Sequence, residues 1–348
     1  MNEGPSAFVV TEDLDDIAKF ILDSVHIADS TVTTNPDLPD APRLQEALSS
    51  LECDQWNQAI LDELAAIKDA GTWELVDPSL HIQNIVGCHF MLQKKCGSNG
   101  EVMHFKACLV AQGFSQCKGI DYSETFAPVV KSASLWVFLA ICACHGRQIQ
   151  QMDIKSAYLN GVISEDIYMC QLKGYEEKGE EGKVAKLKKG LYGLKQAGRE
   201  WYATLHDFLI QLGFTWTHAD HSVFVYQWDT STIIIPVYVD DKLLTGNDDS
   251  LLDSVQHSIG THFKTSDLGT ALWILGIHVQ HDIAARTLFI DQCQYIKGIL
   301  SRFEMTDCTP VDIPLPAGVQ FEPAMSEDHA SISLYPYLEV IGSLCMLC

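Results

Sequence analysis

An apolar strand that ends in two adjacent carboxylates is the feature that most constrains how this chain can fold. The β-branched run Thr232–Tyr238 predicts a strand that reaches a core, and it leads within two residues to Asp240 and Asp241. Residues 242–245 follow as a second short strand, so the segment predicts two strands joined by a tight turn. Two like charges at the end of such a strand repel each other, and a divalent cation would neutralise both. A plain polar β-turn is the alternative reading of the same residues.

The remaining patterns alternate between helix and strand without a regular β-α-β order. Apolar residues at helical spacing predict helices over 44–71, 134–144, 250–263 and 294–303, and another that ends at Gly213. Alternating or β-branched stretches predict strands over 72–76, 104–110 and 274–280, with a hairpin through 282–286. This mixture predicts an α+β fold and argues against a parallel doubly wound sheet.

The net charge of −23, from 23 basic and 46 acidic residues, argues against a protein that binds nucleic acid by bulk electrostatics. The charge is uneven, however. Acidic residues are concentrated before residue 86 and after residue 202, whereas residues 86–202 are net positive. A basic partner surface, if the chain has one, is therefore predicted in its middle.

Several other classes of protein are disfavoured. The N-terminus lacks the basic and apolar regions of a signal peptide, and the most apolar window, 133–144, is shorter than the about 20 residues of a membrane-spanning helix. The 12 cysteines include no Cys-x-x-Cys pair, which argues against a zinc module. We therefore expect a soluble protein with reduced thiols and no membrane partner, and a cytoplasmic location is the default.

Five motifs follow one another along the chain. They are FKACLVAQGFSQCKGIDYSETFAPVVK (105–131), QMDIKSAYLNG (151–161), IYMCQLKGY (167–175), LYGLKQAGREWY (191–202) and YVDD (238–241). Together they resemble the reverse transcriptase domain of copia-type LTR retrotransposons. The resemblance implies an α+β right-hand polymerase with fingers, palm and thumb, in which helices back an antiparallel palm sheet. It also implies an RNA-directed DNA polymerase that binds an RNA or DNA template with its primer, and dNTPs.

The resemblance implies a set of three catalytic, metal-binding carboxylates. Asp153 matches the first aspartate of the palm, and Asp240 with Asp241 matches the paired aspartates of the palm hairpin. Two Mg²⁺ ions, for which Mn²⁺ can substitute, would then support nucleotidyl transfer from a dNTP to the primer 3′-hydroxyl.

Four further residues are candidate substrate contacts by the same resemblance. Tyr158, five residues after Asp153, matches the aromatic steric gate that favours deoxynucleotides; a core tyrosine is the alternative. Gln196 matches the motif that supports the incoming nucleotide and template; a surface residue that caps the next helix is the alternative. Lys106 and Arg199 are plausible partners of triphosphate or template phosphates, with solvated surface charges as the alternative.

The chain departs from the family pattern mainly where an arginine is expected. Cys108 and Trp136 replace such arginines, Leu172 replaces a proline, and Cys117 and Cys293 also lie where arginine is frequent. All are products of single C-to-T changes, so we hypothesise a transposon copy decayed by deamination of methylated cytosine. A cysteine cannot replace a bidentate phosphate clamp, and a buried tryptophan at 136 would overpack its helix. Intact sister copies that also carry Cys108 and Trp136 would contradict this hypothesis.

The expected organisation has three parts. Residues 1–43 form an acidic, mostly disordered segment. Residues 44–313 form the reverse transcriptase domain, with fingers and palm to about 247 and a thumb-like part over 248–313. Residues 314–348 form a truncated connection toward a missing RNase H domain, and the other Pol domains are absent.

The resemblance also leaves the state of the protein open. A homodimer and, if particles assemble, a virus-like particle in the cytoplasm are expected from related polymerases. Two other functions are alternatives. One is a catalytically inactive or domesticated nucleic-acid-binding relic of the same fold, and the other is an unrelated Mg²⁺ phosphotransferase, which the five ordered motifs disfavour.

Overall fold

The computed structural model describes residues 41–78, 81–96, 101–311, 318 and 336–347. These residues belong to two compact units. The larger unit contains the described residues up to Leu272 together with Val279–Phe289, and the smaller one contains Trp273–His278 and the described residues from Ile290 onwards. The expected N-terminal segment and most of the expected C-terminal connection lie outside the described residues.

The first part of the larger unit is a helical layer packed on a long hairpin. Helices α2 (Leu44–Leu48) and α3 (Cys53–Asp69) precede the antiparallel strands β2 (Cys88–Cys96) and β3 (Val102–Ala111). The side of α3 that carries Trp56, Ile60 and Ile67 is fully buried, which is the helical spacing that the sequence showed. Beside it, β1 (Trp73–Val76), β6 (Val184–Leu187) and β5 (Tyr168–Met169) form a small antiparallel sheet in the order β1-β6-β5.

A six-stranded antiparallel sheet forms the second part of the larger unit. Its order is β11-β4-β10-β9-β8-β7. The strands are β4 (Gln150–Ile154), β7 (Thr215–Trp216), β8 (Val223–Trp228), β9 (Ser231–Tyr238), β10 (Asp241–Gly246) and β11 (Thr265–Thr270). Strands β9 and β10 are joined by the acidic turn, and β10 pairs on its other edge with β4. The turn therefore lies in the centre of the sheet's strand order.

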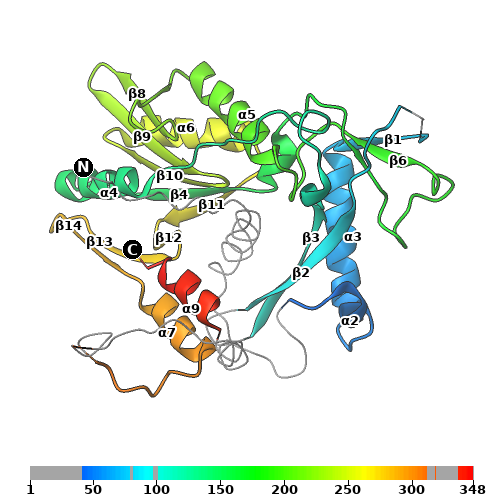
Figure 1. Ribbon diagram of the computed structural model, residues 1–348. Helices are drawn as coiled ribbons and strands as arrows, with labels where there is room; N and C mark the ends of the chain where they lie inside the picture. The colour runs from blue at the N-terminus through cyan, green and yellow to red at the C-terminus, as the bar shows by residue number, and fades with distance from the viewer. Residues whose placement is uncertain (1–40, 79–80, 97–100, 312–317, 319–335, 348) are drawn as a thin grey trace, which may run out of the picture. The chain divides into compact units, whose positions relative to one another are not determined.

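Helices cover both faces of this sheet (Figure 1). On one face, Met152, Phe224 and Leu244 pack with Trp201 and Leu252 of the helices α5 (Ala197–Gln211) and α6 (Asp249–His262). The opposite face of β9 contacts α4 (Ser132–His145), which is apolar on nearly all sides. Residues alternate between the two faces along each strand. The sheet is therefore a central layer between helices. The position of a polar residue along its strand determines which of the two faces its side chain lies on.

A buried carboxylate fixes the start of α4. Asp220 is only 3% exposed, and its two oxygens accept hydrogen bonds from the backbone N–H groups of Lys131 at 2.8 Å and Ser222 at 3.0 Å. The Lys131 Nζ also donates to the Ala219 carbonyl at 2.8 Å. Burial tends to raise the pKa of Asp220, but these backbone donors and the Ser134 side chain hold the pKa below its usual value.

The described residues of the smaller unit include a short strand pair and two helices. Strand β12 (Trp273–Ile274) pairs antiparallel with Ile277 and His278, the first residues of β13 (Ile277–Asp282). The rest of β13 and the first three residues of the next strand, β14 (Thr287–Asp291), belong to the larger unit. In the helices α7 (Cys293–Arg302) and α9 (Tyr337–Leu344), the Tyr295 hydroxyl donates to the Ser343 carbonyl at 2.9 Å. Within the described part of the chain, no helix is long and apolar enough to cross a membrane.

The predicted elements within the described residues are confirmed except at one place. The expected strand 274–280 is broken, because Leu275 and Gly276 adopt left-handed backbone angles and separate β12 from β13. The strands β2, β4, β5, β6, β7, β8 and β11 were not predicted. Strand β11 bonds to β4, and the chain up to Leu272 belongs to the larger unit, while the boundary near residue 247 between palm and thumb-like part stays a prediction.

Replacing Asp220 by Asn should lower the free energy of unfolding by about 2–3 kcal/mol at pH 7, because a neutral amide cannot accept from several donors as the carboxylate does. The folded-state pKa is depressed, so this stabilisation is present above the ordinary carboxylate pKa and is lost as pH falls through the lowered value. The difference between wild type and Asp220→Asn in urea unfolding should thus narrow below about pH 4. The exposed Asp253→Asn serves as control, and an equal effect of both changes would contradict the assignment.

Candidate active site

Strand pairing brings two of the three predicted carboxylates together. Asp153 in β4 and Asp241 at the start of β10 are direct cross-strand partners. The neighbours of Asp153, Met152 and Ile154, point into the core shared with α5 and α6, so Asp153 and Asp241 emerge on the other face of the sheet. The third, Asp240, lies in the turn, and its carbonyl accepts the Ile154 N–H at 3.0 Å. All three carboxylates are half-buried.

The turn that carries the acidic pair has a strained conformation. Val239 has φ +54°, a left-handed value that is costly for a β-branched residue. Its carbonyl accepts a hydrogen bond from the indole Nε1 of Trp201 at 2.8 Å. Trp201 lies on α5 and is buried in the core between this helix and the sheet. The helix therefore holds the turn in this conformation from the side of the sheet that α5 covers. A strained turn at a candidate active site is a common arrangement.

A buried lysine next to the turn was not anticipated from the sequence. Lys242 has no exposed surface, and its ammonium donates to the carbonyls of Asp240 at 2.9 Å and Val239 at 3.4 Å. The same nitrogen lies 5.3 Å from the centre of the Trp201 ring. Burial lowers the pKa of Lys242 to about 7, against the opposing effect of the charges of Asp240, Asp153 and Asp241. Lysines are rarely buried unless they are paired. The only sign in the sequence that Lys242 is buried is its position directly after the acidic pair.

Tyr158 lies close to the turn and is held by its surroundings. It belongs to a short 3₁₀ helix, Ala157–Asn160, and its ring packs edge to face against Tyr192 with centroids 4.7 Å apart. A Cβ on Gly190 would lie 2.6 Å from the Tyr158 carbonyl, so only glycine allows this approach. Burial, followed by the charge of Asp240, raises the pKa of Tyr158 to about 12. Its hydroxyl thus stays protonated near the acidic turn.

Gln196 is a buried connector. It is fully buried at the start of α5; its Nε2 donates to the Asp121 carbonyl at 2.8 Å, and its Oε1 accepts from Gln116 at 3.1 Å. The Gln116 Oε1 in turn accepts the Lys195 N–H at 2.8 Å. The alternative of an exposed capping residue is therefore wrong, because both amide atoms are used to bind residues 116–121 to α5. Gln116 and Asp121 were not anticipated.

Lys106 and Arg199 lie at the surface. Lys106 is exposed on β3 opposite Gln93 in the β2-β3 hairpin. Arg199 lies in the first turn of α5, is 42% exposed and forms a 3.4 Å ion pair with Glu200. Both cations are accessible to an anionic ligand.

The three carboxylates at the turn are oxygen ligands of the type that Mg²⁺ and other hard divalent cations prefer, and the turn itself offers no thiol or imidazole. As the side chains stand, though, no group of three or more His, Cys, Asp or Glu residues in the described ranges is arranged to hold a metal ion. The Asp241 carboxylate accepts a hydrogen bond from the Gln151 amide at 3.2 Å.

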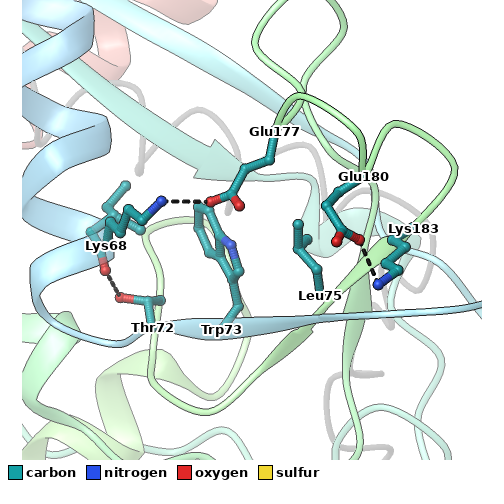
Figure 2. A pocket seen from close by; sticks show the side chains of 8 residues that line it. Lys68, Thr72, Trp73, Leu75, Glu177, Glu180 and Lys183 are labelled. Carbon is teal, nitrogen blue, oxygen red and sulfur yellow. Dashed lines mark hydrogen bonds and ion pairs between the residues drawn. The ribbon is translucent and has the colours of Figure 1, made fainter.

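A cavity of about 240 Å³ lies elsewhere in the larger unit, between the end of α3, β1 and the segment 177–183 (Figure 2). Its rim carries the ion pairs Lys68–Glu177 at 3.0 Å and Lys183–Glu180 at 2.5 Å, over Trp73. None of the predicted site residues lines it.

The residues that stand where the family pattern predicts an arginine differ in how exposed they are. Cys108 is half-buried on β3, whereas Cys117 and Cys293 are exposed. Trp136 on α4 is partly buried, next to Leu135, which is buried, so the full burial expected of this tryptophan is not observed.

An antiparallel sheet with paired carboxylates at a central strand turn is typical of template-directed nucleotidyltransferases. Residues 70–317 match the family model described as reverse transcriptase (RNA-dependent DNA polymerase), and the chain belongs to this family. It is similar to the retrovirus-related Pol polyproteins of copia-type plant transposons.

Two of these relatives are from plants. The chain is 38% identical over 269 residues to that of transposon RE1 from Arabidopsis thaliana, covering 77% of this chain and 18% of the relative. It is 34% identical over 312 residues to that of transposon TNT 1-94 from Nicotiana tabacum, covering 88% and 23%. A Transposon Ty1-LR2 Gag-Pol polyprotein from Saccharomyces cerevisiae is 28% identical over 274 residues, or 77% of this chain and 14% of the relative. The chain thus spans less than a quarter of each relative's length.

Proposed function

We propose that this chain is the RNA-directed DNA polymerase domain of a copia-type retrotransposon, and that Asp153, Asp240 and Asp241 are its catalytic and metal-binding residues. The observation that carries the proposal is the register of β4 with β10, which sets Asp153 opposite Asp241 beside the turn that holds Asp240. In this proposal the six-stranded sheet with α4, α5 and α6 is the palm, and the β2-β3 hairpin with α2 and α3 is the fingers. The thumb-like part then begins after Leu272.

The family normally uses divalent metals, and we assign two Mg²⁺ ions, replaceable by Mn²⁺, to these carboxylates. When bound, the ions would activate the primer 3′-hydroxyl and stabilise the triphosphate and its leaving pyrophosphate. The chain's own contribution is positional. The β4-β10 pairing, the Trp201 indole and the Asp240 carbonyl fix the carboxylates relative to one another before any ligand binds.

The substrate contacts follow from position and exposure. Tyr158 is held rigidly by Tyr192 near Asp240, which suits a steric gate against the ribose 2′-hydroxyl. The exposed Lys106 and Arg199 would bind phosphates of the triphosphate or template. Gln196 would act as a positioning residue, because its amide is already bonded to Gln116 and Asp121.

The partners in this proposal are a primed RNA or DNA template and dNTPs. A homodimer, a cytoplasmic location and virus-like particles remain proposals taken from related polymerases.

A second candidate is a nucleic-acid-binding relic that keeps the fold without turnover. It is favoured by Cys108, which replaces an expected arginine, and by the buried positive charge beside the carboxylates. Both would weaken phosphate or metal binding and leave the sheet intact.

Primer extension on poly(rA)·oligo(dT) separates the two candidates. With Mg²⁺ or Mn²⁺ the wild type should incorporate dTTP, and Asp240→Asn should reduce incorporation by at least about 10²-fold because it removes a charge from the metal-binding set. The exposed Asp253→Asn should retain activity. Binding of the primed template without incorporation in either metal would refute the polymerase proposal and support the relic.

The steric gate has its own test. Tyr158→Val should raise the incorporation of ribonucleotides relative to deoxynucleotides by about tenfold or more, since it opens space at the sugar. Tyr158→Phe keeps the ring and should keep the discrimination. Single-nucleotide extension with dTTP and UTP gives both ratios; equal ratios in Tyr158→Val and wild type would exclude the gate.

A further inference from the structure

Lys242 places a fully buried amine beside the turn that carries the proposed metal site. Along β10, Leu244 packs into the core with α5 and α6, and Lys242, two residues away, extends from the same face. Asp241 emerges on the opposite face with Asp153. The Lys242 ammonium lies on the core side of the turn and donates hydrogen bonds to the Asp240 and Val239 carbonyls.

The charge of this ammonium is poorly screened. The side chain has no exposed surface, so water and salt do not surround it, and the electric field in such a medium is much stronger than in solvent. Asp240, Asp153 and Asp241 all interact electrostatically with it. The lysine therefore supplies to the three carboxylates part of the neutralisation that a divalent cation would otherwise supply, while it repels that cation.

We propose that Lys242 is an internal cation that weakens divalent metal binding at Asp153, Asp240 and Asp241. The inference rests on the proposed function for the location of the ions. It adds to the proposed function that this chain binds divalent metal ions weakly, and that Lys242 is the cause.

A purely structural role for Lys242 is the competing explanation, because its ammonium donates two hydrogen bonds to the strained turn. Two substitutions separate the roles. Lys242→Met keeps the unbranched shape and removes both charge and donor, whereas Lys242→Gln removes the charge and keeps an N–H donor. Lys264→Met is the matched control, since Lys264 is an exposed lysine of the same unit whose carbonyl binds the Lys155 N–H.

The test is direct Mn²⁺ binding to the full chain without nucleic acid, measured from the electron paramagnetic resonance signal of free Mn²⁺. Lys242→Met and Lys242→Gln should bind Mn²⁺ at least about tenfold more tightly than wild type, and Lys264→Met should remain within about twofold. Adding Asp240→Asn to Lys242→Gln should abolish the gain, which locates it at the turn. Circular dichroism and thermal unfolding verify that each variant is folded.

Unchanged or weaker Mn²⁺ binding by folded Lys242→Gln would overturn the proposal. Failure of both Lys242 variants to fold would also overturn it, since the ammonium would then be a structural donor. A gain that survives Asp240→Asn would do the same, because the site would lie elsewhere. Each result is independent of primer extension: metal binding can increase in a chain that does not polymerise, and a polymerising chain can show no effect of Lys242.

Discussion

The antiparallel pairing of β4 with β10 is the interaction on which the rest of the site depends. It converts two carboxylates that are 88 positions apart in the sequence, Asp153 and Asp241, into direct neighbours on one face of a sheet. A shift of one residue in this register would turn Asp153 toward the helices and bring Met152 to the polar face. The alternation along β4 opposes this slip, because Met152 and Ile154 are buried in the core with α5 and α6 in the observed register. The core therefore determines the geometry of the site.

Much of this could be predicted from the sequence, and the failures have physical reasons. The β-branched run before Asp240 and the helical spacing from Trp56 to Ile67 are local signals, and both elements formed as expected. The pairing partner of a strand is not a local property, so the sequence alone could not set Asp153 opposite Asp241; the family resemblance supplied that expectation. The short strands β5 and β7 contain two residues each, too few to show any periodicity.

The roles of individual polar residues were harder to anticipate than the elements that carry them. Gln196 was expected to contact substrate or solvent, but burial at the start of α5 commits its amide to Asp121 and Gln116. Lys242 shares a face of β10 with Leu244, but both faces of this strand are covered, and the sequence does not show that. The Asp121 carbonyl that binds Gln196 is 75 residues away in the sequence, so this contact exists only in the folded chain. The carbonyls that bind Lys242 are local, and what the sequence does not show is the burial of the amine beside them.

Cys108, where the family resemblance predicts an arginine, lies next to a contact that joins β3 to the helical layer. The Glu63 carboxylate on α3 accepts the Leu109 N–H of β3 at 3.1 Å. Burial raises the pKa of Glu63, while this backbone donor and the charge of Lys106 act in the opposite direction. Burial also raises the pKa of the Cys108 thiol. A thiol carries no positive charge, so the exposed Lys106 is the neighbouring residue on β3 whose charge favours the ionised form of Glu63.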